Sequence, residues 1–236
     1  MELHNIDAVP PYLRINPYVT TGYRFVSSHA DACRSLFHNH NCSADTWTSV
    51  FTFVHAWVLY LCFSPRDSVF FLHLLNGILH APPSVAYHLL GCSGIGESWF
   101  FFYQSLDYLF IFISSVPLLV ALGSVTPGYP LTIGLFLLLC LCCAVTVRLV
   151  RGHRYTPVDR LKDMLCLVCS HSGPVLFAHS TLAVPILCSY AIGGAFYAFR
   201  IPERYKRGTW FTSHAWMHVF INVAYHCQFH YLRIVK

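Results

Sequence analysis

Long apolar stretches follow one another along almost the whole chain and restrict it to an all-α membrane protein. Seven of them approach the roughly 17–25 residues that a helix needs to cross a bilayer. They are residues 47–64, 68–91, 98–122, 130–149, 161–180, 182–199 and 210–233. Only 11% of the 236 residues are charged, against about 25% in a typical soluble domain. The sequence therefore predicts a bundle of seven transmembrane helices.

The chain divides into an N-terminal segment, residues 1–46, and a transmembrane domain, residues 47–236. The N-terminal segment has no compact apolar core followed by a small-residue cleavage site, so we do not expect a signal peptide. We expect this segment to lie in the cytosol or at the membrane interface. The fifth apolar stretch is the weakest, because it contains Lys162, Asp163 and Pro174. Six helices and a re-entrant segment are the alternative arrangement.

Basic residues gather on one side of the predicted bundle. The N-terminal segment and the connections after the second, fourth and sixth spans share that side and hold twelve of the 15 Lys and Arg residues. Because an excess of Lys and Arg marks cytoplasmic connections, the sequence predicts a cytosolic N-terminus and a C-terminus outside the cell or in a lumen. A G-protein-coupled receptor has the opposite orientation. The net charge of +5 reflects this bias, so nucleic acid is not an expected partner.

Five polar residues from three predicted helices fall at a similar depth in the membrane. His214 and His218 are four residues apart, so both lie on one face of a helix, and Ser84 and His88 have the same spacing. At 1.5 Å per residue, these four and Asp107 lie about 5–13 Å from the predicted cytoplasmic surface. Ionisable side chains at such a depth are expensive and usually functional.

The residue types at this depth indicate a zinc site. Three histidines with an open fourth position are a ligand set of catalytic zinc, and His88, His214 and His218 are the candidate ligands. Zinc lowers the pKa of a bound water toward 7. Asp107 is the candidate general base, or a group that orients the water. Ser84 is placed to hydrogen-bond the water or a developing oxyanion.

A second histidine pair, His226 and His230, lies near the other end of the last predicted span. Asn222 lies between the two pairs, and His73 and His179 are predicted at a depth similar to that of the second pair. Because no acidic residue is predicted there, we interpret this second group as interfacial or packing histidines.

Several short motifs occur in a fixed order along the chain. They are Asn16-Pro17-Tyr18-Val19, Thr21-Gly22-Tyr23-Arg24, Ser84 with His88, Asp107-Tyr108, Pro202-Glu203-Arg204, and Ser213-His214 with His218. In order and spacing, they resemble the motifs of the progestin and adipoQ receptors (PAQR), which include the adiponectin receptors. These proteins are related to the bacterial hemolysin III proteins and, more distantly, to alkaline ceramidases.

The resemblance implies a seven-helix bundle with a cytosolic N-terminus and one zinc ion near the cytoplasmic face. On the matching positions, the implied zinc ligands are His88, His214 and His218. The family is linked to hormone or lipid signalling, and several members to ceramide hydrolysis. We therefore expect a receptor-like membrane protein that hydrolyses a ceramide-like lipid amide and recognises an extracellular or lipid ligand. Its expected location is the plasma membrane, or the Golgi and other endomembranes.

Two alternatives to the hydrolase stay open. In the first, zinc is purely structural and the protein is a receptor without hydrolase activity. In the second, less favoured, the polar stripe of the last span serves a transporter or channel, which leaves the grouping of Ser84, His88 and Asp107 unexplained.

The chain departs from the family pattern in two regions. In the block before the first span, Cys42 stands where the family has Glu and Ser49 where it has His. In the connection before the last span, Arg207 replaces a proline, and the segment from Gly208 to Ser213 is about three residues short. We expect these changes to affect substrate entry, partner recognition and the height of the last span.

Overall fold

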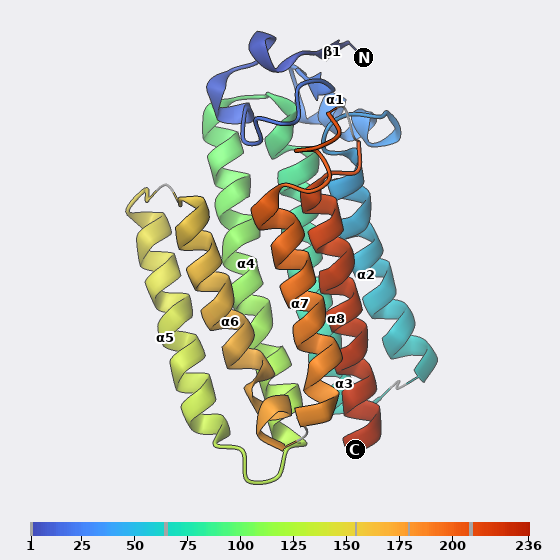
Figure 1. The fold of residues 1–236 in the computed structure, drawn as a ribbon, viewed down its shortest axis with the longest axis vertical. Helices are drawn as coiled ribbons and strands as arrows, with labels where there is room; N and C mark the ends of the chain where they lie inside the picture. The colour runs from blue at the N-terminus through green and yellow to red at the C-terminus, as the bar shows by residue number, and fades with distance from the viewer. Residues whose placement is uncertain (1, 64–65, 154, 179, 208–209) are drawn as a thin grey trace.

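The computed structural model describes residues 2–63, 66–153, 155–178, 180–207 and 210–236. Within these residues, seven long helices run along one another, with the N-terminal segment covering one end of the bundle and the C-terminus at the other (Figure 1). The long helices are α2 (Ser43–Phe63), α3 (Ser68–Leu89), α4 (Glu97–Ser124), α5 (Leu131–Val150), α6 (Pro157–Ala178), α7 (Ser180–Phe199) and α8 (Ser213–Val235). Helix α8 contacts α2, α3, α4 and α7.

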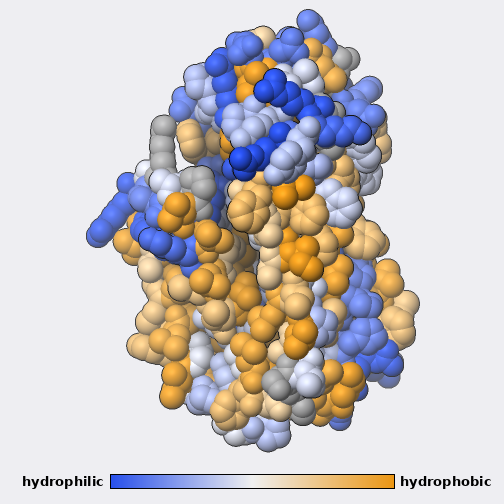
Figure 2. Space-filling model, in the orientation of Figure 1, coloured by the Kyte–Doolittle hydropathy of each residue, from blue (hydrophilic) through white to orange (hydrophobic). Residues whose placement is uncertain are grey.

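The surface of the bundle is that of a membrane protein. Apolar side chains cover its middle, and hydrophilic ones gather over the N-terminal end (Figure 2). Helices α2, α3, α4, α5 and α7 are long and apolar enough to cross a membrane. Helices α6 and α8 have comparable lengths, 22 and 23 residues, but carry more polar side chains. An all-α membrane protein is therefore confirmed, whereas seven spans and the orientation of the termini stay predictions.

Several helix ends differ from the predicted spans. Helix α2 begins at Ser43, four residues before the predicted start, so Asp45 lies in its first turn. Helix α6 begins at Pro157 rather than at residue 161, and α8 begins at Ser213 rather than at residue 210. For α2 and α6 the apolar pattern places the start too late, because polar and acidic residues are favoured in the first turn of a helix while counting against a membrane span. For α8 it places the start too early, because Trp210 and Phe211 extend the apolar run.

The N-terminal segment forms a small folded cap on the bundle. Its elements are β1 (Leu3–His4), η1 (Ile6–Ala8), η2 (Pro11–Leu13), β2 (Tyr23–Arg24), α1 (His29–Arg34) and η3 (Ser35–Phe37), and β1 pairs antiparallel with β2. Val9, Leu13 and Tyr23 pack in one apolar cluster with Tyr87 of α3 and Phe100 of α4. Helix η4 (Gly91–Ser93), between α3 and α4, lies under this cap.

Arg24 attaches the cap to the end of α3. Its side chain is fully buried, and its Nη2 donates to the backbone oxygens of His88 and Leu89 at 2.7 and 2.6 Å. Its Nη1 donates to the hydroxyl of Ser35. A helix ends with unpaired carbonyl groups, and a cation there also complements the helix dipole. Arg24 therefore fixes the backbone of His88.

Glu203 attaches the cap to the start of α8. Its carboxylate is fully buried and accepts from Asn16 Nδ2 and from the backbone N–H of Ser213, both at 2.7 Å, and also from the Ser213 hydroxyl. A carboxylate at a helix N-terminus pairs with unpaired N–H groups and with the dipole. The positions of α3 and α8 are thus set by four residues of the sequence motifs: Asn16, Arg24, Glu203 and Ser213.

A partly buried ion pair connects α5 and α6. Arg148 donates to both oxygens of Asp163 at 2.9 and 2.8 Å, and Tyr108 of α4 donates to the same carboxylate at 3.0 Å.

We expect Arg148→Met to lower the free energy of unfolding by roughly 2–3 kcal/mol. This is less than the roughly 3–5 kcal/mol of a fully buried pair, because Arg148 is one-third exposed. Thermal melting of the purified protein measures this effect. Arg148→Met/Asp163→Asn should recover part of the loss, and an equally unstable double variant would contradict the ion-pair explanation.

Candidate metal centre

Helices α3 and α8 bring His88, His214 and His218 together. One ring nitrogen of each histidine lies within 4.8 Å of those of the other two. The ring centroids are 4.8 Å apart for His88 and His214, 5.3 Å for His88 and His218, and 4.7 Å for His214 and His218. The four-residue spacing on α8 produces the last contact, and the end of α3 supplies the third ring. The three predicted ligands are therefore neighbours.

The surroundings of these rings fit a metal ion. Among the described residues, neither ring nitrogen of the buried His88 has a hydrogen-bond partner, although buried polar groups are normally paired. His218 Nδ1 contacts the hydroxyls of Thr48 and Ser49 at 2.9 and 3.3 Å, which leaves its Nε2 available. Ligand histidines commonly use their second nitrogen in this way. The donor set and the unpaired nitrogens both match zinc.

Asp45 is a site residue that the sequence analysis did not identify. Its Oδ2 lies 4.0 Å from His88 Nδ1, and its Oδ1 accepts from Thr212 at 3.4 Å. It is buried in the first turn of α2. A search for acidic residues inside the predicted spans could not find Asp45, because the first span was placed two residues beyond it.

Asp107 and Ser84 lie in the same region but have other nearest partners. Asp107 Oδ1 is 3.7 Å from His80 Nε2, and the carboxylate is close enough to His88 and His218 to interact with both electrostatically. Ser84 is buried, and its hydroxyl lies 3.0 Å from that of Ser49. His80 was not anticipated, although its spacing from Ser84 and His88 puts all three on one face of α3.

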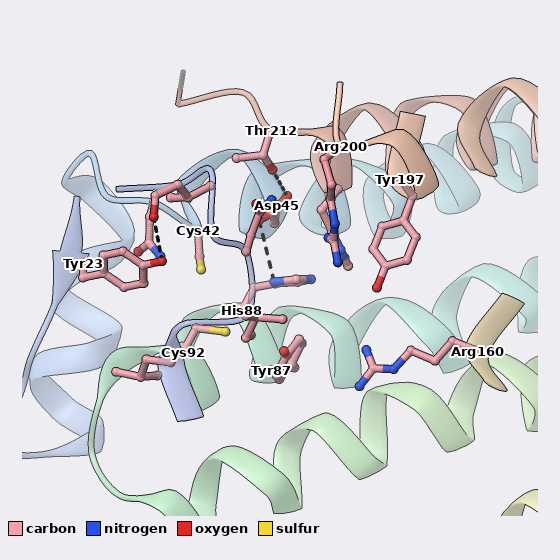
Figure 3. A pocket seen from close by; sticks show the side chains of 16 residues that line it. Tyr23, Cys42, Asp45, Tyr87, His88, Cys92, Arg160, Tyr197, Arg200 and Thr212 are labelled. Carbon is pink, nitrogen blue, oxygen red and sulfur yellow. Dashed lines mark hydrogen bonds and ion pairs between the residues drawn. The ribbon is translucent and has the colours of Figure 1, made fainter. Parts of the chain in front are cut away.

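A cavity of about 80 Å³ lies beside the histidines, under the cap. Asp45 and His88 line it on one side, and Arg160, Tyr197 and Arg200 point into it from α6 and from the end of α7 (Figure 3). The Arg200 guanidinium lies 4.9 Å from the Tyr197 ring centroid. Since one water needs roughly 10–15 Å³, the cavity has room for several waters but not for a lipid chain.

Cys42, one of the departures from the family pattern, lies in this cavity. Cys42, His88 and Cys92 form a second group whose ligand atoms lie within 4.8 Å of one another. The backbone N–H of Cys42 donates to His40 Nδ1 at 3.2 Å. Burial, together with the neighbouring Arg24 charge, lowers the pKa of His40 to about 3, so His40 stays a neutral acceptor. The other departure, Ser49, contacts both His218 and Ser84.

The second predicted histidine group is only partly assembled. His226 and His230 are neighbours on α8, with ring centroids 4.7 Å apart. His73 is buried against Tyr225 instead, with its Nε2 3.2 Å from the Tyr225 backbone oxygen. His179 lies outside the described residues, as does Gly208 of the shortened connection.

Comparison with known families identifies one that matches most of the chain. A model of the family described as "Haemolysin-III related" matches residues 37–229. The matched region contains the whole helical bundle except the last six residues of α8, and therefore includes His88, His214 and His218. The N-terminal cap up to residue 36 lies before it. The chain belongs to the haemolysin-III related family, which is the family of the progestin and adipoQ receptors.

Proposed function

We propose that this protein is a receptor-like zinc hydrolase that cleaves a ceramide-like lipid amide within the membrane. The observation that carries the proposal is the convergence of three histidines, His88, His214 and His218, with neither ring nitrogen of the buried His88 hydrogen-bonded among the described residues. In this proposal the three rings hold zinc. The bound metal would polarise the amide and supply an activated water at neutral pH.

The side chains around the histidines have separate roles in this mechanism. Asp107 takes a proton from the attacking water and returns it to the leaving amine, while His80 holds the Asp107 carboxylate in place. Thr48 and Ser49 orient the His218 ring, and Asp45 is near enough to His88 Nδ1 to orient that ring. Burial excludes bulk water, which strengthens each of these electrostatic interactions.

The cavity supplies groups that suit the polar part of a lipid amide. Arg160, Tyr197 and Arg200 line the side of the cavity that faces His88. Arginine and tyrosine donate hydrogen bonds to a carbonyl or to a carboxylate product. The acyl chain does not fit in the cavity, so we place it between helices, with entry sideways from the bilayer. Under the predicted orientation, this chemistry takes place near the cytoplasmic face.

Asp107→Asn separates catalysis from metal binding. We expect the variant to keep its zinc and to lose at least about 100-fold in turnover, since a positioned acid–base group contributes roughly 10²–10⁴-fold. Release of fatty acid from ceramide in mixed micelles, quantified by mass spectrometry, measures turnover, and elemental analysis measures zinc. Asp31→Asn is the matched control, because Asp31 lies in the cap and pairs only with cap residues among the described contacts. Turnover unchanged in Asp107→Asn would remove Asp107 from the mechanism.

A second candidate function is a receptor in which zinc only fixes α3 to α8. The contact that favours it is the pairing of Asp107 with His80, which places the carboxylate nearest to a residue outside the histidine triad. A wild-type protein that holds zinc but releases no fatty acid from ceramide supports this second candidate.

A further inference from the structure

Helix α8 carries a second histidine pair with the same geometry as the first. The rings of His226 and His230 have a centroid distance of 4.7 Å and an interplanar angle of 71°, the same values as for His214 and His218. The Nε2 atoms of His226 and His230 are 3.0 Å apart. Two nitrogens each about 2.0–2.1 Å from one metal ion fit this separation. The two rings are hydrogen-bonded in the structure, at a separation that one bound ion also fits.

His55 of α2 fixes which nitrogen of His226 faces His230. His55 Nε2 lies 3.3 Å from His226 Nδ1, so the His226 Nδ1–H can donate to His55. Its Nε2 then carries the lone pair and points at His230. A metal-bound histidine usually donates its other N–H to such an acceptor. At the first site, Thr48 and Ser49 occupy the corresponding place beside His218 Nδ1.

The second pair is accessible from the surface of the bundle. His230 is exposed and His226 is partly exposed. On the side where α2 and α8 lie, hydrophilic surface interrupts the apolar band toward the C-terminal end (Figure 2). Polar side chains within such a band are expensive unless they serve a function. His226 stacks on His55, with ring centroids 5.4 Å apart, while His230 lies at the surface.

We propose that His226 and His230 bind a divalent transition metal ion such as Zn²⁺ through their Nε2 atoms. Imidazole ligands suit zinc, copper and nickel. With two protein ligands, the remaining coordination positions are filled by water, so the ion exchanges with the aqueous phase at the C-terminal end of α8. Binding is weaker than at a three-histidine site. The bound ion connects adjacent turns of α8 and stiffens the helix whose other end carries His214 and His218.

Zinc binding at equilibrium tests this site. The full chain in detergent is dialysed against a buffer that holds free Zn²⁺ at a fixed micromolar concentration, and bound zinc per chain is measured by elemental mass spectrometry. We expect the wild type to bind one more zinc than His226→Ala/His230→Ala. His214→Ala/His218→Ala should retain this exchangeable ion, so the result does not depend on the proposed hydrolase site. Exposed His38 supplies the control, His38→Ala, which should match the wild type.

Chemical modification gives a second measurement on the unaltered protein. Diethyl pyrocarbonate acylates accessible unprotonated imidazoles, and peptide mass spectrometry identifies the modified residues. Added Zn²⁺ should protect His226 and His230 several-fold while His38 stays reactive. If zinc binding is equal in the wild type and in His226→Ala/His230→Ala, or if zinc gives no protection, the proposal is wrong and the pair is a hydrogen-bonded pair of neutral imidazoles.

Discussion

Replacing both candidate ligands of α8, in His214→Ala/His218→Ala, should reduce tightly bound zinc from about one ion per chain to none. One remaining histidine cannot hold an ion that normally needs four ligands, three of them from the protein. Among the described residues, His88, His214 and His218 are the one group of three imidazoles whose ligand atoms lie within 4.8 Å of one another. Fatty acid release from ceramide should fall to background in the same variant. Elemental mass spectrometry, after dialysis against zinc-free buffer, measures the ion.

The control for this experiment is a histidine on the same chain but away from the site. His38 is exposed in the cap, so His38→Ala should keep its zinc and its activity. Size-exclusion chromatography and circular dichroism establish that each variant is folded. Zinc retained by the folded double variant would place the ion elsewhere, for example with Cys42 and Cys92 beside His88. Folded wild-type protein without zinc would rule out the hydrolase proposal.

Arg24→Met should destabilise the protein by roughly 3–5 kcal/mol. The variant leaves the buried backbone oxygens of His88 and Leu89 without their donor, at roughly 1–3 kcal/mol each, and it removes a cation from the end of α3. For a chain of this size, the melting temperature should fall by on the order of 10 °C. Because Arg24 holds the backbone of His88, zinc affinity should also fall, by about 10–100-fold.

Two further variants show whether the effect of Arg24 on stability and zinc affinity comes from its geometry or from its charge. Arg24→Lys keeps the charge but cannot reach both carbonyl groups with one planar group, so its melting temperature should lie between those of wild type and Arg24→Met. Arg14 donates only to backbone oxygens of the cap, Val9 and Asp7, in the described contacts. Arg14→Met should therefore leave the zinc affinity unchanged. If Arg24→Met has the same melting temperature as the wild type, Arg24 does not hold α3 in place.

Apolar patterning predicted the bundle because lipid leaves a chain few other solutions. Every backbone polar group in the hydrocarbon must be paired internally, so each long apolar stretch becomes a helix. The same pattern misplaced the polar helix ends, since the first turn of α2 lies beneath the cap rather than in lipid. The first turn of α2 holds Asp45, and so the carboxylate beside His88 Nδ1 was missed.

The three histidines were predictable because helical spacing alone puts His214 beside His218. Their environment was not, because it depends on contacts between residues far apart in the sequence. Ser49 is a departure from the family pattern by sequence, yet in the structure it contacts His218. His80 of α3 pairs with Asp107 of α4. A pair between two helices leaves no local pattern in the sequence from which it could be predicted.

The cap has a consequence for how the protein is made. Asn16 is synthesised 187 residues before its partner Glu203, and Arg24 64 residues before its partner His88. A chain emerging from the ribosome in order can therefore dock Arg24 once α3 has been made, but Asn16 has no partner until Glu203 has been synthesised. The attachment of the cap to the start of α8 is therefore made last, when Glu203 and Ser213 have been added. Chains that stop before α8 would lack this second attachment of the cap, a feature by which quality control can recognise them.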